Sequence, residues 1–410
     1  MTGVSVLRTG DRAMIRELNT SIVLDCIRRE GPISRAEIAR VTGMGRSTIS
    51  GIVAFLLEKG LVETVGAGTS TGGRKPELLA FRPDRYWVAG IKLQPGGIKA
   101  VLTDLNGQIV SRAEASVAQR DLESALAAID GVYARLTANL DPGRLLGAGL
   151  AIPGLVDSGR GISVRPHFFD WRDAPIRELM EERWGIPVWV DNDARVGALG
   201  ERWRLSETDA TFLFVTIGIG IGAGIVVDGA LMEGDLVGAG HLGHMMIVPD
   251  GAPCHCGLTG CLETVASDAA LARYMRELRA AQGREPEQLA PEEIFSLART
   301  GDPAANAAVD RVVGYLAIAI GNVIKLLGIR RVIIGGETGV IGGPLLFERL
   351  QERVREQVFS DTQSGIEVVP SLLGNDVWTV GAASLVLDAL FRPPIYADAS
   401  TMVDRVVQGG

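Results

Sequence analysis

Residues 240–263 read GHLGHMMIVPDGAPCHCGLTGCLE, and the cysteines in this stretch decide how the rest of the chain is interpreted. Three of the four cysteines in the chain fall within eight residues here, and a histidine stands ten residues upstream of the first of them. One imidazole and three thiolates form the closed tetrahedral set that is typical of structural zinc. The predicted zinc ligands are His244, Cys254, Cys256 and Cys261.

His255 lies between two of these ligands and alternates away from them, so it is left out of the set. A group of buried free thiols is the alternative interpretation. The N-terminus lacks the charged and then apolar pattern of a secretion signal, which favours metal binding over a disulfide for clustered cysteines. The same observation predicts a cytoplasmic protein.

Just upstream, residues 211–227 read TFLFVTIGIGIGAGIVV and carry no charge. The length of this stretch approaches that of a membrane span. Its glycines, however, alternate with other residues from position 218 to position 224, which is poor for a helix and natural for a tight strand-turn-strand. We therefore predict a buried hairpin, and no membrane partner.

The first eighty residues show helical periodicity. A first helix is predicted to end near Gly31-Pro32, a capping box from Ser34 to Glu37 opens a short second helix, and Gly43 permits a sharp turn. A third helix is predicted at 46–59, with a single buried face. The apolar positions behind these predictions are Leu18, Ile22, Val23, Cys26 and Ile27 in the first helix, Ile38 in the second, and Ile49, Ile52, Val53, Leu56 and Leu57 in the third.

The outer side of the third helix is small and polar in its first two turns, the part of a recognition helix that meets base edges in the major groove. Residues 60–79 then read as a strand, a Gly/Ser/Thr turn and a second strand, which predicts a β-wing with two cations at its tip. We therefore predict a winged helix-turn-helix that binds double-stranded operator DNA. The predicted DNA contacts are Ser34, Arg35, Arg46, Ser47, Thr48, Ser50, Arg74 and Lys75.

Charge is distributed unevenly along the chain. The 410 residues have a net charge of −8, whereas residues 1–80 carry 11 Lys and Arg against 8 Asp and Glu. A basic head on an acidic body suits a DNA reader and argues against a protein that coats nucleic acid indiscriminately. Two alternatives stay open: a three-helix packing module without nucleic acid, and a wing whose Arg74 and Lys75 form only a solvated linker.

From residue 86 onward the pattern is one of strands and helices that alternate. Strands are expected at 86–93, 98–104, 145–152, 188–190 and 332–334, and helices at 122–140, 175–184 and 311–327. This alternation predicts an α/β body with a mixed sheet in two lobes. We divide the chain into a DNA-binding domain at 1–80, a ligand-sensing domain at 81–392 and a tail at 393–410.

Five motifs follow one another in this body. They are AIPGLVD at 151–157, DNDA at 191–194, GIGIGAG at 218–224, the stretch at 240–263 and VIIGG at 332–336. In this order they resemble the ROK family (repressors, open reading frames and sugar kinases), from about residue 86 to residue 391, and the winged head matches the repressor branch of that family. The resemblance implies an actin-like (ribonuclease-H-like) fold, in which two lobes enclose a cleft with sugar at its base and, in kinases, ATP above it.

The resemblance also implies the site residues. It places the zinc ligands at the same four positions and implies that a sugar is bound by Asn192, Asp193, His241, His244 and Glu263. Asp193 matches the general base of the kinases, but a carboxylate that can deprotonate a hydroxyl can also simply bind it. His241 stands where the family usually has glutamate, so a weaker, titratable acceptor changes which hydroxyl pattern is satisfied.

The phosphate-binding loops depart from those of the kinases. Where kinases of the family carry Asp-x-Gly-Gly-Thr, this chain has Lys92-Leu93-Gln94-Pro95-Gly96, and Pro95 has no N–H to donate. The second loop, Gly-Thr-Gly in kinases, is Gly218-Ile219-Gly220, and Glu337 replaces a glycine near the adenosine site. Because phosphoryl transfer depends on positioning and charge neutralisation, we predict that the chain is not an enzyme.

These observations together predict a transcriptional repressor of carbohydrate metabolism, with a small-molecule sugar effector in a catalytically degenerate kinase-like domain. One helix-turn-helix reads too few base pairs, so we expect a homodimer or homotetramer. Two further alternatives stay open: an ATP-dependent sugar kinase with a DNA-binding head, and a constitutive DNA-binding protein with a vestigial pocket.

Overall fold

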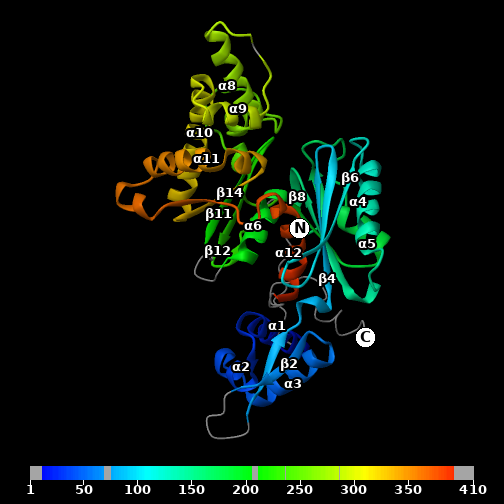
Figure 1. The fold of residues 1–410 in the computed structure, drawn as a ribbon. Helices are drawn as coiled ribbons and strands as arrows, with labels where there is room; N and C mark the ends of the chain where they lie inside the picture. The colour runs from blue at the N-terminus through cyan, green and yellow to red at the C-terminus, as the bar shows by residue number, and fades with distance from the viewer. Residues whose placement is uncertain (1–11, 69–74, 206–210, 236, 286, 392–410) are drawn as a thin grey trace.

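The computed structural model of the 410-residue chain describes residues 12–68, 75–205, 211–235, 237–285 and 287–391 (Figure 1). A small head, drawn in blue, lies at one end, and two larger lobes stand side by side beyond it. The predicted α/β body in two lobes, preceded by a helical head, is therefore confirmed. The predicted tail at 393–410 lies outside the described residues.

The head combines helices with a three-stranded sheet in the order β1-β3-β2. Its elements are α1 (Arg12–Glu30), β1 (Ile33–Ser34), α2 (Arg35–Thr42), α3 (Arg46–Glu58), β2 (Val62–Ala67) and β3 (Glu77–Phe81). The predicted capping box is present, because the Glu37 N–H donates to the Ser34 hydroxyl and the Ser34 N–H donates to the Glu37 carboxylate. Gly43 ends α2 in the left-handed conformation, with φ of 70°.

The buried faces of the head agree with the prediction for α3 and differ for α1. Ile49, Ile52, Val53 and Leu56 of α3 are buried as predicted, with Leu57 half-buried. In α1 the buried side chains include Val23, Leu24 and Ile27, whereas Leu18 and Ile22 are only half-buried. The reason is that α1 is packed on two sides, by α2 and α3 and by the last helix of the chain, and a periodicity argument for one face misses the second.

The first lobe contains a mixed sheet in the order β10-β7-β4-β5-β6. Its strands are β4 (Trp87–Gln94), β5 (Gly97–Thr103), β6 (Ile109–Ser116), β7 (Leu145–Ile152) and β10 (Val188–Asn192), and a short hairpin joins β8 (Leu155–Asp157) to β9 (Ile162–Arg165). Helices α4 (Leu122–Thr137) and α5 (Ile176–Trp184) cover one face of the sheet. The predicted strands and helices are confirmed here, although α4 ends at residue 137 and not at 140.

The second lobe contains a sheet in the order β13-β12-β11-β14-β15. Its strands are β11 (Phe212–Ile217), β12 (Ile221–Val227), β13 (Ala230–Leu231), β14 (Arg331–Gly335) and β15 (Glu367–Pro370). Its helices are α7 (Glu263–Ala266), α8 (Asp268–Ala281), α9 (Pro291–Arg299), α10 (Pro303–Leu327) and α11 (Glu337–Glu356). The predicted buried hairpin is confirmed, since β11 and β12 pair antiparallel with Ile217 opposite Ile221.

Helix α10 is the central helix of the second lobe and begins earlier than the predicted residue 311. By length and composition alone it could cross a membrane. Of its most apolar window, however, 61% is buried inside the lobe, as is usual for a core helix.

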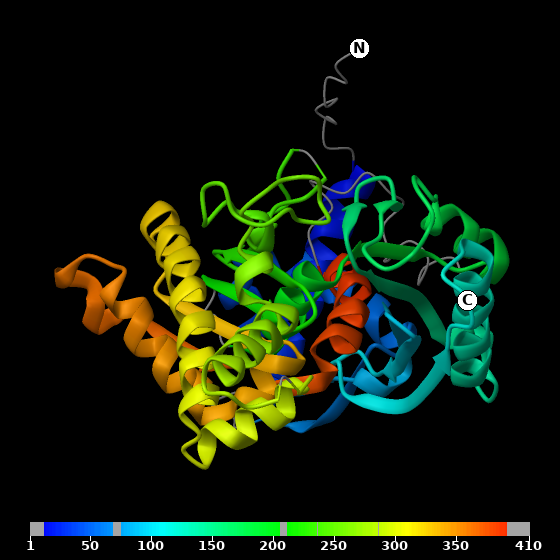
Figure 2. The ribbon, with the colours of Figure 1, turned by 90° about the horizontal axis from the view of Figure 1, so that it is seen from above.

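Two helices lie between the lobes, α6 (Asp193–Arg204) and α12 (Val377–Phe391). Helix α6 follows the first lobe along the chain but packs on β11 and β12 of the second, while α12 follows the second lobe but packs on β4 and β7 of the first. Figure 2 shows α12, in red, between the lobes. The approach is close enough to require glycine, because a Cβ on Gly149 would lie 1.8 Å from the carbonyl oxygen of Ala382.

The head is joined to the body by one continuous hydrophobic cluster. The cluster runs from α1, through Tyr86 and Val88, to Val386 and Leu390 of α12. The hydroxyl of Ser21 in α1 also donates to the Leu390 carbonyl at 3.4 Å. The predicted division at residue 80 falls one residue before the end of β3 and cuts through the core that the head and the body share.

Candidate functional site

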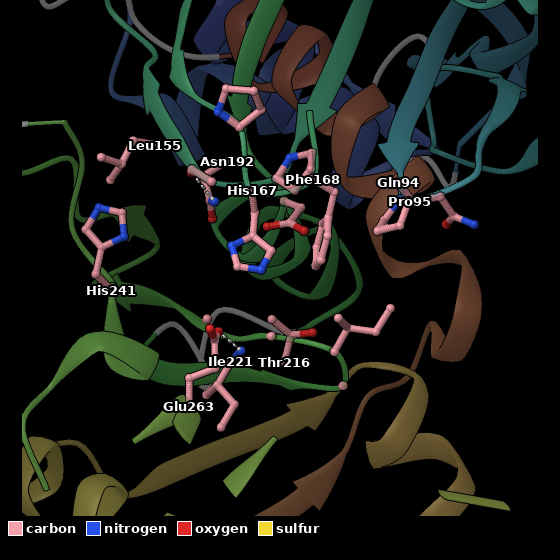
Figure 3. A pocket seen from close by; sticks show the side chains of 18 of the residues that line it. Gln94, Pro95, Leu155, His167, Phe168, Asn192, Thr216, Ile221, His241 and Glu263 are labelled. Carbon is pink, nitrogen blue, oxygen red and sulfur yellow. Dashed lines mark hydrogen bonds between the residues drawn. The ribbon is translucent and has the colours of Figure 1, made fainter. Parts of the chain in front are cut away.

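A cavity of about 620 Å³ lies between the two lobes and is lined by residues of both. Figure 3 shows Gln94 and Pro95 at one end of it, Leu155 and His241 at the other, and Glu263 on the side of the second lobe. The ligand-binding residues that the sequence predicts all line this cavity: Asn192, Asp193, His241, His244 and Glu263.

Asn192 and Asp193 stand where β10 ends and α6 begins. The Asn192 side-chain oxygen caps α6 by accepting from the N–H groups of Ala194 and Arg195, at 2.9 and 3.3 Å. Its amide group donates to the Gly154 carbonyl at 2.9 Å. Since a side-chain amide has two N–H donors, one remains for a ligand.

Asp193 is the acidic side chain of the cavity on the first lobe. Its carboxylate accepts from the Ala194 N–H at 2.9 Å. Burial raises the pKa of Asp193, and the nearby positive charge of Lys92 opposes that rise. A half-buried carboxylate with free acceptor capacity suits the binding of a hydroxyl group.

Glu263, at the start of α7, is held by two partners. One of its oxygens accepts from the Ile221 N–H at 3.0 Å, and the other lies 2.7 Å from Nε2 of His255. His241, in contrast, has a buried Nε2 without a hydrogen-bond partner among the described residues. Among the described residues, the protein therefore supplies hydrogen-bond partners to the Glu263 carboxylate but none to Nε2 of His241.

The lining residues that were not predicted from the sequence include Arg165, His167 and His255. Arg165, at the end of β9 in the first lobe, donates to the carbonyls of His255 and Cys256 in the second, at 2.5 and 3.5 Å. The rings of His167 and His255 meet edge to face, with centroids 3.5 Å apart. These contacts join residues that are about ninety positions apart in the chain, so no local sequence pattern predicts them.

The four predicted metal ligands converge in the second lobe. The ligand atoms of His244, Cys254, Cys256 and Cys261 all lie within 4.8 Å of one another. The His244 Nδ1 to Cys254 Sγ distance and the Cys256 Sγ to Cys261 Sγ distance are both 3.7 Å. Tetrahedral zinc with bonds of about 2.3 Å requires ligand atoms about 3.8 Å apart, so the residues fit the ion.

A second donor set overlaps the first and includes His255 and Glu263 in place of two cysteines. We favour the set with three cysteines, because thiolates suit zinc and the His255–Glu263 pair lines the cavity. Burial, followed by hydrogen bonding with Cys256 and Cys254, raises the pKa of the Cys261 thiol to about 12. A divalent cation is what would hold these thiols together as thiolates.

The two turns that the sequence predicts to stand in place of the phosphate loops differ in form. Pro95 and Gly96 form a two-residue turn between β4 and β5, with Gln94 opposite Gly97 and Gly96 at φ of 79°. The β11–β12 turn keeps glycine on both sides of Ile219, whose side chain is exposed. Lys92, Gln94, Pro95, Ile219 and Glu337 all line the cavity.

The predicted DNA-contacting residues of α3 form an exposed row at its start: Arg46, Ser47, Thr48 and Ser50. Lys75 is exposed just before β3, and Arg74 lies outside the described residues. The Arg35 guanidinium lies 2.7 Å from the Glu77 carboxylate and so ties α2 to the wing.

The structure corrects the prediction that Ser34 contacts DNA. Only 4% of its surface is exposed, and its hydroxyl lies 2.7 Å from the Glu37 carboxylate. The Ser34 hydroxyl, which would have to donate to a DNA phosphate, is already engaged in the capping box with Glu37. The structure therefore argues against Ser34 as a DNA contact.

Comparison with known proteins finds two families along the chain. The sequence profile of the ROK family matches residues 88–389, and that of the MarR family matches residues 17–70. The xylose repressor of Bacillus subtilis (strain 168) is 30% identical over 381 residues, which cover 92% of this chain and 97% of that protein.

Two solved structures share the fold. A ROK family transcriptional regulator, a homolog of the E. coli MLC protein, has a TM-score of 0.83 at 27% identity and covers 96% of this chain and 100% of its own. A ROK family glucokinase from Streptomyces griseus, in complex with glucose and AMPPNP, has a TM-score of 0.66 at 27% identity and covers 73% of this chain and 98% of its own. The regulator thus extends over nearly the whole chain and the glucokinase over less of it.

Proposed function

This chain belongs to the ROK family, and we propose that it is a sequence-specific DNA-binding repressor of carbohydrate metabolism whose sugar effector binds in the cleft between the lobes. The xylose repressor and the MLC homolog match along nearly its full length, including the MarR-type head. We infer a cytoplasmic location from this function.

One observation carries the proposal: both helices between the lobes run from the cleft to the same arginine of the head. Helix α6 begins at Asp193 and carries Trp203 near its end, while α12 carries Trp378 of the cavity lining at its start and Phe391 at its end. The Arg28 guanidinium carbon lies 4.7 Å from the centroid of the Trp203 ring and 5.0 Å from that of Phe391.

This arrangement supplies a route from ligand to DNA. A ligand that draws the lobes together changes the angle between α6 and α12, because each helix is packed on a different lobe. Arg28 lies on α1, which packs on α2 and α3, so the change reaches the recognition helix. Sugar binding then shifts the population of head orientations without a covalent step.

We propose that the His244, Cys254, Cys256 and Cys261 set holds structural zinc. The ion would fix the loop that carries His255 and leads into Glu263, both of which line the cavity. Because Arg165 of the first lobe donates to carbonyls of this loop, the same loop also sets how closely the lobes approach.

We propose further that the cleft does not transfer phosphate. Pro95 cannot donate an N–H to a nucleotide phosphate, and Glu337 places an exposed carboxylate at the start of α11, beside the cavity. An assay of ADP release with pentoses and hexoses tests this point. Turnover that disappears in Asp193→Ala would favour the alternative, a sugar kinase with a DNA-binding head.

The assembly is proposed to be a homodimer or homotetramer, because paired half-sites are the usual way in which a helix-turn-helix gains specificity. Sedimentation of the full chain, with and without operator DNA, measures this state directly. A monomer that binds its operator with high affinity would contradict the proposal.

The central test is operator binding. DNA sites are first selected from a random library with the full-length chain and then titrated against a panel of sugars. We expect Arg46→Ala to weaken selected-site binding by about 10-fold or more, whereas Arg120→Ala, an exposed arginine of the first lobe, leaves it unchanged. A chain that selects no DNA sequence would contradict the proposed function.

The proposed route has its own test. Arg28→Ala removes the cation–π contacts with Trp203 and Phe391 and leaves the hydrophobic packing of α1 on α12, so sugar affinity and operator affinity should persist while sugar-induced release from the operator is reduced. Calorimetry with sugar and fluorescence anisotropy with labelled operator measure the two affinities separately. Normal sugar-induced release in Arg28→Ala would show that the signal does not pass through this contact.

A further inference from the structure

Lys92 is a buried cation in the cleft. It lies near the end of β4, lines the cavity and is only 7% exposed. Its Nζ stands 3.1 Å from the centroid of the Trp378 ring. Within the described part of the chain, no hydrogen bond or ion pair joins this ammonium to another residue.

The protein leaves the hydrogen-bonding capacity of Lys92 largely unused. An ammonium group has three N–H donors and no acceptor, and the face of one indole ring occupies at most one of them. Burying an unpaired charge is costly unless a partner with hydrogen-bond acceptors is present. Burial lowers the pKa of Lys92 to about 8, against the opposing effect of Asp193 and Glu337, so the group is still mostly charged at neutral pH.

The surroundings of Lys92 favour an anion. Trp378 lies in the first turn of α12, and the N-terminal end of this 15-residue helix carries the positive end of its dipole. Lys92 and Gln94 point to the same side of β4, and Gln94 stands at one end of the cavity in Figure 3. The opposite end holds His241, and the hydroxyl-binding candidates Asn192 and Asp193 also line the cavity.

We propose that the effector is an anionic sugar, a sugar acid or a sugar phosphate, whose carboxylate or phosphate oxygens accept hydrogen bonds from the Lys92 ammonium. This inference rests on the proposed function, because it names the chemical class of the effector. The hydroxyl groups of the ligand meet Asn192 and Asp193, and its anionic group occupies the place beside Lys92 and the start of α12.

The proposal also gives the anion a role in the response. A ligand anion that accepts hydrogen bonds from Lys92 competes with the Trp378 ring for the same ammonium. Trp378 belongs to α12, whose far end packs against α1 of the head. A neutral sugar reaches the hydroxyl-binding residues but leaves the contact between Lys92 and Trp378 in place.

The first experiment is calorimetry with matched ligands: glucose, glucuronate, gluconate and glucose 6-phosphate, and xylose with xylonate. We expect at least one acid or phosphate to bind about 10- to 100-fold more tightly than its neutral parent. Lys92→Met should remove that preference and leave the affinity for the neutral parent within about threefold. The acid and phosphate arms distinguish the two sources of the anion.

Lys99→Met is the matched control. Lys99 lies directly opposite Lys92 in the β4–β5 register but does not line the cavity. The control should keep the preference for the anionic ligand. A neutral sugar that binds as tightly as its acid and its phosphate, or a preference that survives Lys92→Met, would overturn the proposal, as would Lys92-dependent binding of AMPPNP alone.

A second measurement does not depend on the choice of sugar. The chain has five lysines, at positions 59, 75, 92, 99 and 325, so a protein with ¹³C-labelled lysine side chains gives few Cε signals. Inorganic phosphate and acetate should shift the signal that is missing in Lys92→Met and leave the others in place. A Lys92 signal that does not respond to either anion contradicts the proposal.

Operator binding in the same samples separates the two hypotheses. If the chain binds its operator and a neutral sugar releases it independently of Lys92, the proposed function stands and the anionic effector is wrong. If the chain binds no operator but shows Lys92-dependent anion binding, the proposed function is wrong and the anion site stands.

Discussion

The two lobes of the body have the same strand order and different turns. In each sheet the first strand in sequence lies at the centre, with the second and third strands on one side and the fourth and fifth on the other. In the first lobe the leading hairpin turns through Pro95 and Gly96, just after Lys92. In the second lobe the corresponding turn is Gly218 to Gly220. The two sheets thus share one strand order and differ in the residues of the leading turn.

The lobes also differ in what stabilises them. The first lobe rests on its sheet, on α4 and α5, and on the backbone contact with α12. The second lobe has a large helical core and, in addition, the histidine and three cysteines that fit zinc. Within the described residues, no comparable cluster of metal ligands occurs in the first lobe.

The largest expected effect comes from the metal ligands. Cys256→Ala removes one thiolate, so we expect loss of bound zinc and a fall in the free energy of unfolding of roughly 4 kcal/mol or more, since metal binding is coupled to folding. Zinc content by elemental analysis and urea unfolding followed by tryptophan fluorescence measure the two effects.

Cys26→Ala is the matched control, because Cys26 is a buried cysteine of the head and lies outside the metal cluster. It should retain one zinc per chain and lose only about 1 kcal/mol of unfolding free energy. Full zinc content in Cys256→Ala would contradict the ligand assignment.

The sequence predicted this difference between the lobes only in part. The cysteine spacing at 254–261 predicts a metal site because its three thiols are close together in the chain. The strands were also predictable, since alternation and apolar runs are local properties. Thus the hairpin at 211–227 could be told from a membrane span by its alternating glycines.

What escaped prediction depends on contacts across the fold. His255 was set aside on local alternation, yet in the structure it pairs with Glu263 and meets His167 of the other lobe. Ser34 was placed at the DNA, although its own capping box buries it. The burial of Lys92 against Trp378 joins residues nearly three hundred positions apart, and no spacing rule reaches that far.

The second-largest expected effect concerns the close packing of each lobe on one helix, the first lobe on α12 and the second on α6. A Cβ at Gly149 would lie 1.8 Å from a backbone oxygen of α12, whereas one at Gly224 would lie 2.4 Å from the Ala198 side chain and 3.0 Å from a backbone oxygen of α6. We expect Gly149→Ala to cost about 3 kcal/mol of unfolding free energy and Gly224→Ala about 1 to 2 kcal/mol. Equal losses in urea unfolding would show that both lobes adjust to their helices equally.

The smallest effect concerns Lys92 and carries a pH dependence. Burial lowers its pKa from 10.5 to about 8, with Asp193 and Glu337 opposing the shift and Lys99 adding to it. Between about pH 8 and pH 10.5 the unfolded chain therefore binds more protons than the folded one, so stability of the unmodified protein rises with pH in this window. Below the window, the buried charge costs about 3 kcal/mol.

Lys92→Met removes this cost but also the cation–π contact with Trp378, worth about 1 to 2 kcal/mol. We therefore expect the variant to be more stable than the unmodified protein by about 1 to 2 kcal/mol at pH 7, and the difference to shrink as pH rises toward 10. Urea unfolding of both proteins from pH 7 to pH 10 measures it. A less stable variant at pH 7 would mean that Lys92 stabilises the first lobe. A more stable one would mean that the lobe keeps a destabilising cation for its ligand.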